Sequence, residues 1–246
     1  MQKSFSSVSS KQMQKSFSNK PNNLSQPEKP RWWFRFLVLG VLALPILVWN
    51  GRREQQPPPE KNPFGHLPQL AMAGGDPYIR ALMRTISASE SNAKNPYVLL
   101  YGGDHVHNLN RHPNVCRQIA SGPNQKKCST AAGRYQFLTS TWLEKARKYH
   151  PHPHGSTGLS TYSFEPKYQD KVTYKWLKDH RTWGTDIPFL LRQGRVDEVL
   201  QMLSGTWTSL GYGIEDNWVT PYLAKIYQQV LAEELTRVQS LGDRHH

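Results

Sequence analysis

Glu90 is the residue best suited to chemistry, because it stands where a helix is expected to carry an apolar side chain. Four apolar residues at helical spacing precede it and predict a buried helix face: Ile79, Leu82, Met83 and Ile86. The next position on that stripe, four residues further on, is Glu90. A carboxyl group at the inner end of a core helix is a candidate for a raised pKa and general acid catalysis. The ordinary alternative is a solvated surface charge.

Three further segments have residue types that suit a sugar-binding surface. Residues 102–113, 130–137 and 207–213 each combine glycine with aromatic, histidine or amide side chains. Glycine allows close backbone approach, aromatic rings cover sugar faces, and amides and hydroxyls bond the substituents. Taken singly, each segment is also an ordinary turn.

The elements that must position these residues are mostly helices. Asp76 and Pro77 have the types expected at a helix start. We expect Thr139 or Ser140 to cap a further helix, and other helices to begin near Pro166, near Val196 and at Thr220-Pro221. The sequence also predicts a strand over 97–101 and a hairpin turn at 102–104. This order predicts an α+β domain, mostly helical, with one small β-hairpin sheet.

The net charge leaves several kinds of partner open. The chain has a net charge of +13, and its first 62 residues carry ten Lys/Arg against three Asp/Glu. The remaining part is therefore only moderately basic, which suits a polyanionic wall or a membrane surface as well as nucleic acid. Because no nucleic-acid-binding signature is present, we expect no nucleic-acid partner.

The first 75 residues predict a tethered domain. Residues 1–30 are polar, repeat the hexapeptide MQKSFS, and predict a disordered cytoplasmic tail. Residues 31–50 predict one transmembrane signal anchor, and the basic residues before it place the N-terminus in the cytoplasm. A cleaved signal peptide is the alternative. Residues 51–75 predict a proline-rich linker and 76–240 a catalytic domain in the extracytoplasmic or periplasmic space.

Cys116 and Cys128 are the two cysteines of the chain. Their spacing does not fit a zinc site, so we expect no metal. The sequence implies no organic cofactor either. A disulfide is the favoured interpretation for a domain outside the cytoplasm, and two reduced thiols are the alternative.

The motifs together resemble a known family. Ser89-Glu90, Gly102-Gly103-Asp104, His112-Pro113, Gly133-Arg134-Tyr135-Gln136, Gln169-Asp170 and Trp207-x-Ser209-Leu210-x-Tyr212-Gly213 follow one another in a familiar order. The order is similar to that of the lambda-type lytic transglycosylases, glycoside hydrolase family 104 of the lysozyme superfamily. The resemblance covers roughly residues 77–235, and its Gly-Arg-Tyr-Gln block is the most specific part.

The resemblance implies a lysozyme-like domain that cleaves the β-1,4 bond between N-acetylmuramic acid and N-acetylglucosamine in peptidoglycan. Glu90 matches the glutamate that serves as both acid and base in that family, where the muramyl C6 hydroxyl closes on C1. No second carboxylate is then required, unlike in the usual glycosidase scheme.

The matching motifs supply the candidate substrate-binding residues. These are Ser89, Asp104, Arg134, Tyr135, Gln136 and Tyr212. Asp104 also fits a simple turn residue, and Arg134 fits an anchor beneath the following two residues. Tyr135 and Gln136 are the better candidates for substrate contact.

We therefore expect a monomeric, membrane-anchored muramidase that gives a 1,6-anhydromuramyl product. A hydrolytic lysozyme with Asp104 as second carboxylate is the first alternative. The second is an inactive wall-binding domain tethered to the membrane.

Overall fold

The computed structural model describes residues 65, 67–120, 124–154 and 161–243. All of them belong to one compact unit, Gln56–His246. The predicted tail (1–30) and anchor (31–50) lie outside the described residues, as does most of the predicted linker. Within the part of the chain that is described, no helix is long and apolar enough to cross a membrane.

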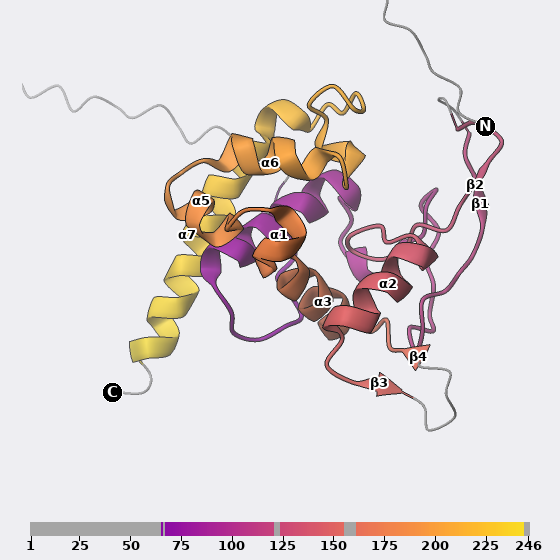
Figure 1. The fold of residues 1–246 in the computed structure, drawn as a ribbon, viewed down its shortest axis with the longest axis horizontal. Helices are drawn as coiled ribbons and strands as arrows, with labels where there is room; N and C mark the ends of the chain where they lie inside the picture. Colours follow the sequence, from indigo (N-terminus) through magenta and orange to yellow (C-terminus); the bar gives the residue numbers. More distant parts are fainter. Residues whose placement is uncertain (1–64, 66, 121–123, 155–160, 244–246) are drawn as a thin grey trace, which may run out of the picture. The chain divides into compact units, whose positions relative to one another are not determined.

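Helix α1 (Pro77–Glu90) begins and ends as its sequence predicts. The Asp76 carboxylate accepts a hydrogen bond from the N–H of Tyr78 at 2.9 Å and caps the helix. The apolar stripe that precedes Glu90 is fully buried. It packs mainly against the long C-terminal helix α7 (Leu223–Gly242), which crosses α1 in Figure 1. Glu90 is therefore the last residue of a core helix.

The other helices are α2 (Thr139–Tyr149), α3 (Pro166–Lys178), α4 (His180–Trp183), α5 (Ile187–Arg192) and α6 (Val196–Ser204), with 3-10 turns η1 (Pro96–Val98), η2 (Thr208–Leu210) and η3 (Thr220–Tyr222). Of these helices, α3 and α5 also pack against α1, and the rest pack around them. The predicted helices near 139, 166, 196 and 220 are confirmed, with η3 preceding α7. Helices α4 and α5 were not predicted. The N-cap of α2 is Leu138 rather than Thr139 or Ser140.

The strands are short antiparallel pairs. Strand β1 (Arg117–Gln118) pairs with β2 (Cys128–Ser129), and β3 (Pro153–His154) pairs with β4 (Thr161–Tyr162). A disulfide joins Cys116 to Cys128 beside the first pair, which confirms that prediction. The domain is thus mostly helical α+β, as expected.

The predicted strand over 97–101 is wrong in its first half. This half forms η1, whose first residue is a proline with a φ fixed near the helical value. The second half pairs only through single bridges, such as Leu99 with His105. The glycine turn at 102–104 lies between these two residues, so the predicted hairpin turn is confirmed.

The predicted domain boundary at residue 76 is also too late. Residues 67–74, which we call the strap, pack onto the domain: Leu67, Leu70 and Met72 are buried in its core. Buried charged side chains bind the strap backbone, among them Arg84, which donates to the carbonyl of Leu67 at 2.8 Å. The C-terminal part of the proline-rich segment is therefore structural rather than a free linker.

Candidate active site

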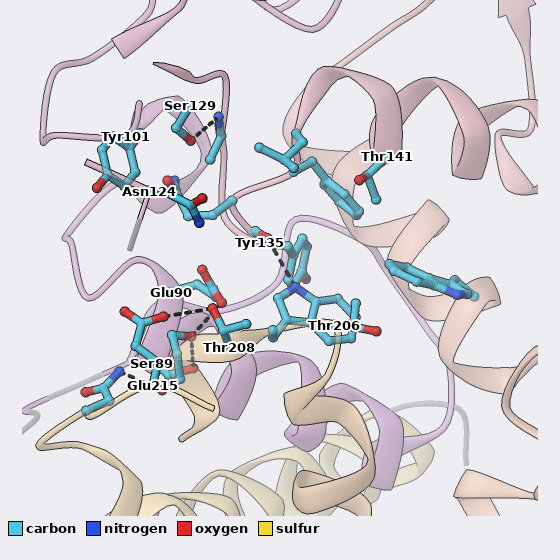
Figure 2. Close-up of a pocket in the computed structure, with 18 residues that line it drawn as sticks. Ser89, Glu90, Tyr101, Asn124, Ser129, Tyr135, Thr141, Thr206, Thr208 and Glu215 are labelled. Carbon is cyan, nitrogen blue, oxygen red and sulfur yellow. Dashed lines mark hydrogen bonds between the residues drawn. The ribbon is translucent and has the colours of Figure 1, made fainter. Parts of the chain in front are cut away.

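A cavity of roughly 530 Å³ opens beside the C-terminal end of α1. Ser89 and Glu90 line one side, with the η2 segment, while Tyr101, Asn124 and Ser129 lie across from them in Figure 2. The floor is made of the 131–138 segment and of aromatic and hydroxyl side chains from α2, α3 and the chain before η2. The full lining is Ser89, Glu90, Tyr101, Asn124, Ser129, Ala131, Tyr135, Gln136, Phe137, Leu138, Thr141, Trp176, Thr206, Trp207, Thr208, Ser209, Glu215 and Asn217.

Glu90 is half-buried at this wall and has one described hydrogen-bond donor. The Ser209 hydroxyl donates to Glu90 Oε1 at 2.5 Å and lies 3.1 Å from the Ser89 hydroxyl. Ser209 is the central residue of η2, so the contact joins the first helix to the C-terminal part of the chain. The placement of Glu90 at the end of a buried helix stripe is as the sequence predicts.

The surroundings of Glu90 favour its neutral form. Burial raises its pKa to about 7; the hydrogen bond from Ser209 opposes this rise, and the negative charge of Glu215 adds to it. A carboxyl group with this pKa is protonated in a large fraction of molecules near neutral pH. Glu90 can therefore donate a proton to a ligand in the cavity and afterwards accept one.

Glu215, which sequence reasoning missed, is the second carboxylate of the cavity lining. The side chain is exposed, and its Oε2 accepts a hydrogen bond from the Thr208 hydroxyl at 2.7 Å. Asn217 donates to the backbone carbonyl of Ser209 at 2.6 Å and so closes the loop onto η2. The signal in the sequence was weak, because these residues lie just past the 207–213 motif in an aperiodic loop.

The Gly-Arg-Tyr-Gln block forms a tight hairpin turn in the cavity floor. Ala132 and Phe137 pair through two backbone hydrogen bonds, and the block is the turn between them. A Cβ atom at Gly133 would lie 2.3 Å from Gln169 Oε1, and its φ is +73°, so glycine is required there. Gln136 lines the cavity with a left-handed φ of 45°.

The other two residues of this block point into the protein. Arg134 is fully buried and donates to the strap carbonyls of Pro68 and Gln69 at 2.7 and 2.8 Å. The Tyr135 hydroxyl donates to Asp170 at 2.7 Å, although other atoms of Tyr135 contribute to the cavity lining. Arg134 is not among the residues that line the cavity, and its geometry fits the alternative of an anchor from below.

Asp104 and Tyr212 are not among the residues that line the cavity. Asp104 is exposed on its turn and forms an ion pair with Arg117 at 2.6 Å. The Tyr212 hydroxyl donates to Asp197 at 3.2 Å. The structure thus brings Ser89, Glu90, Tyr135 and Gln136 together but leaves these two side chains in interactions elsewhere.

A stack of aromatic rings forms another part of the cavity floor. Trp176 and Trp207, which both line the cavity, have ring centroids 5.0 Å apart, and Trp183 stacks on Trp176 at 5.4 Å. The Trp207 indole N–H donates to the carbonyl of Tyr135 at 3.2 Å. Trp176 and Trp207 are 3% and 4% exposed, so they contribute a small apolar part of the lining beside its hydroxyls.

No cluster of three or more His, Cys, Asp or Glu side chains that could hold a metal ion occurs in the described part of the chain. The polar groups that line the cavity are the carboxylates of Glu90 and Glu215 together with hydroxyl and amide side chains.

Comparison with known proteins places the chain in a family. The Endolysin family model matches residues 80–233, which span α1 to α7, so the chain belongs to the Endolysin family. The endolysin of Escherichia phage lambda is 28% identical over 144 residues, which cover 57% of this chain and 79% of the relative.

Two solved structures are also similar. One is bacteriophage lambda lysozyme complexed with a chitohexasaccharide, with 24% identity, a TM-score of 0.48 and coverage of 65% of this chain and 97% of the other. A second structure of lysozyme from bacteriophage lambda has 22% identity, a TM-score of 0.46 and coverage of 66% and 97%.

Proposed function

We propose that this protein is a peptidoglycan-degrading muramidase that cleaves the β-1,4 bond between N-acetylmuramic acid and N-acetylglucosamine. The observation that carries the proposal is Glu90: a carboxyl group with a pKa raised to about 7, opening into a cavity floored by aromatic rings, in a member of the Endolysin family. The lambda relative bears the name endolysin, and the solved lysozyme of that phage was complexed with a chitohexasaccharide.

In the reaction, Glu90 first acts as an acid. Its proton passes to the glycosidic oxygen while the bond from that oxygen to the muramyl C1 breaks, and positive charge develops at C1. The ionised Glu90 then takes the proton of the muramyl C6 hydroxyl, whose oxygen bonds to C1. The product is a 1,6-anhydromuramyl end, and Glu90 regains its proton. The Ser209 hydroxyl supports the ionised state by donating to Oε1.

The position of Asp104 favours this transglycosylase route over the hydrolytic alternative built on Asp104. A base for an attacking water must reach the reacting centre, but Asp104 lies outside the cavity lining and is paired with Arg117. The substrate hydroxyl needs no such base besides Glu90.

The proposed enzyme works outside the cytoplasm as a monomer held to the membrane by residues 31–50. The disulfide between Cys116 and Cys128 supports an oxidising compartment. Protease digestion of intact spheroplasts tests this location: the domain of the full chain should be degraded while cytoplasmic proteins survive. Protection of the domain until lysis would contradict it.

The decisive experiment is the chemical form of the product. Purified peptidoglycan is digested with the full-length protein, and the muropeptides are analysed by mass spectrometry. We expect products lighter than the hydrolysed ones by one water molecule. Reducing muropeptides alone would establish a lysozyme, and intact sacculi would leave a binding domain. Glu90→Gln keeps the shape but removes the acid, so it should lower the rate by about 10³-fold.

A further inference from the structure

The turn η2 holds two carboxylates with two successive hydroxyls. Ser209 donates to Glu90, and its neighbour Thr208 donates to Glu215 at 2.7 Å. Asn217 bonds the backbone of the same turn at 2.6 Å, so the chain after Glu215 is tied back to η2. Glu90 and Glu215 thus line the same cavity, and each accepts a hydrogen bond from a hydroxyl of η2 (Figure 2).

We propose that Glu215 is a second functional carboxylate of this cavity, whose negative charge helps Glu90 to keep its proton until a glycan is bound. The inference rests on the proposed function of Glu90 as an acid. Glu215 acts through Glu90 and is therefore a positioning residue for the proton, not a group that bonds the reacting atoms.

Apart from Glu90 itself, Glu215 is the one charged side chain in the cavity lining. The other ionisable side chains in the cavity lining are those of Tyr101 and Tyr135, and no Lys, Arg or His belongs to that lining. The Tyr135 hydroxyl is turned away and donates to Asp170. A like charge disfavours ionisation of its neighbour, in agreement with the raised pKa of Glu90.

Solvent exposure of Glu215 gives the effect a signature of its own. The energy between an exposed charge and a half-buried one depends on salt, because mobile ions screen the exposed partner. The contribution of burial to the raised pKa of Glu90 is not screened in this way. Added salt should therefore reduce the influence of Glu215 and leave the influence of burial in place.

The test compares Glu215→Gln with the wild-type full chain and with Asp216→Asn as a matched control. Asp216 is exposed on the same loop and is not part of the cavity lining, so Asp216→Asn removes an equal charge one position away. Activity is measured from pH 5 to 9 at low and high salt. In Glu215→Gln the alkaline limb should move to lower pH by roughly half a unit at low salt. High salt should move the wild-type limb in the same direction and leave the limb of Glu215→Gln nearly unchanged.

A second readout does not depend on activity. Carbodiimide with an amine modifies protonated carboxyl groups, and peptide mass spectrometry measures the modification of Glu90 separately at each pH. Its midpoint should fall in Glu215→Gln and stay in place in Asp216→Asn. Equal midpoints in all three proteins would overturn the role of Glu215, even if the enzyme proved inactive on peptidoglycan.

The activity data have two further outcomes. An equal shift in both variants would reduce Glu215 to one of many surface charges. If the wild type released reducing muropeptides and Glu215→Gln lost activity at every pH, Glu215 would instead be a base for attacking water, and the positioning role would be overturned. Retained activity in Glu90→Gln would remove the proposed function itself.

Discussion

Asp170 and Glu90 are two carboxyl groups of the same domain. Burial raises the pKa of both, but their surroundings differ. Asp170 lies on α3 and accepts four hydrogen bonds: from the N–H groups of Ala71 and Met72, and from the hydroxyls of Tyr97 and Tyr135. These distances lie between 2.7 and 3.0 Å, and the side chain is fully buried. Its capacity for hydrogen bonds is filled by the protein.

Glu90 has fewer described hydrogen-bond donors than Asp170. Its described hydrogen bond comes from Ser209, and the side chain faces a cavity large enough for a ligand. The comparison separates two uses of a buried carboxyl group. A group with a complete set of donors stabilises the fold, whereas one with few donors and an open face is available for proton transfer.

Asp170→Ala should have the largest effect on stability. The change removes a negative charge that acts on the buried Arg134, and it removes the acceptor of two hydroxyls and two backbone N–H groups. We expect the free energy of unfolding to fall by about 3–5 kcal/mol, measured by urea denaturation at pH 7. A loss below about 1 kcal/mol would show that this network adds little and would undo the comparison.

Leu70→Ala tests the strap that supplies two of the donors to Asp170. Leu70 is 5% exposed, so its truncation should cost about 2–4 kcal/mol. Gln69→Ala is the matched control, because the exposed side chain can be removed while its backbone carbonyl still binds Arg134. If Leu70→Ala were as mild as the control, residues 67–74 would be a linker after all.

The sequence predicts local features of this domain better than distant contacts. The helix that ends at Glu90 follows from the spacing of its apolar residues, and the turn at 102–104 follows from its glycines. The docking of the strap could not be predicted in this way, because Pro68 and Arg134 are 66 residues apart. Residue type alone does not decide the role of Arg134, because a guanidinium in a sugar-site motif can also bind buried backbone carbonyls. Glu215 lies in an exposed loop without periodicity, so no pattern pointed to it.

Glu90→Gln should raise the free energy of unfolding above neutral pH, whereas Asp170→Ala should lower it. In the unfolded chain Glu90 ionises near pH 4.5, but in the folded state it holds its proton to about pH 7. Wild-type stability from this group is therefore present below pH 4.5 and is lost as the pH rises to about 7. Glutamine mimics the protonated form without this loss.

The variant should thus match the wild type at pH 4 and exceed it by about 1–3 kcal/mol at pH 8, measured by chemical denaturation at both values. An equal difference at both pH values would mean that Glu90 titrates normally in the folded protein. Glu90 would then no longer differ from Asp170 as a carboxyl group available for proton transfer.

Asp104→Ala should have the smallest effect. Its ion pair with Arg117 is exposed on both sides, with 63% and 43% of the two side chains accessible, so the loss should stay below about 1 kcal/mol. Activity on peptidoglycan should remain within about twofold of the wild type, because the side chain lies outside the cavity. A decrease as large as that of Glu90→Gln, with normal stability, would return Asp104 to the role of second carboxylate. The substrate hydroxyl would then no longer be needed to explain the reaction.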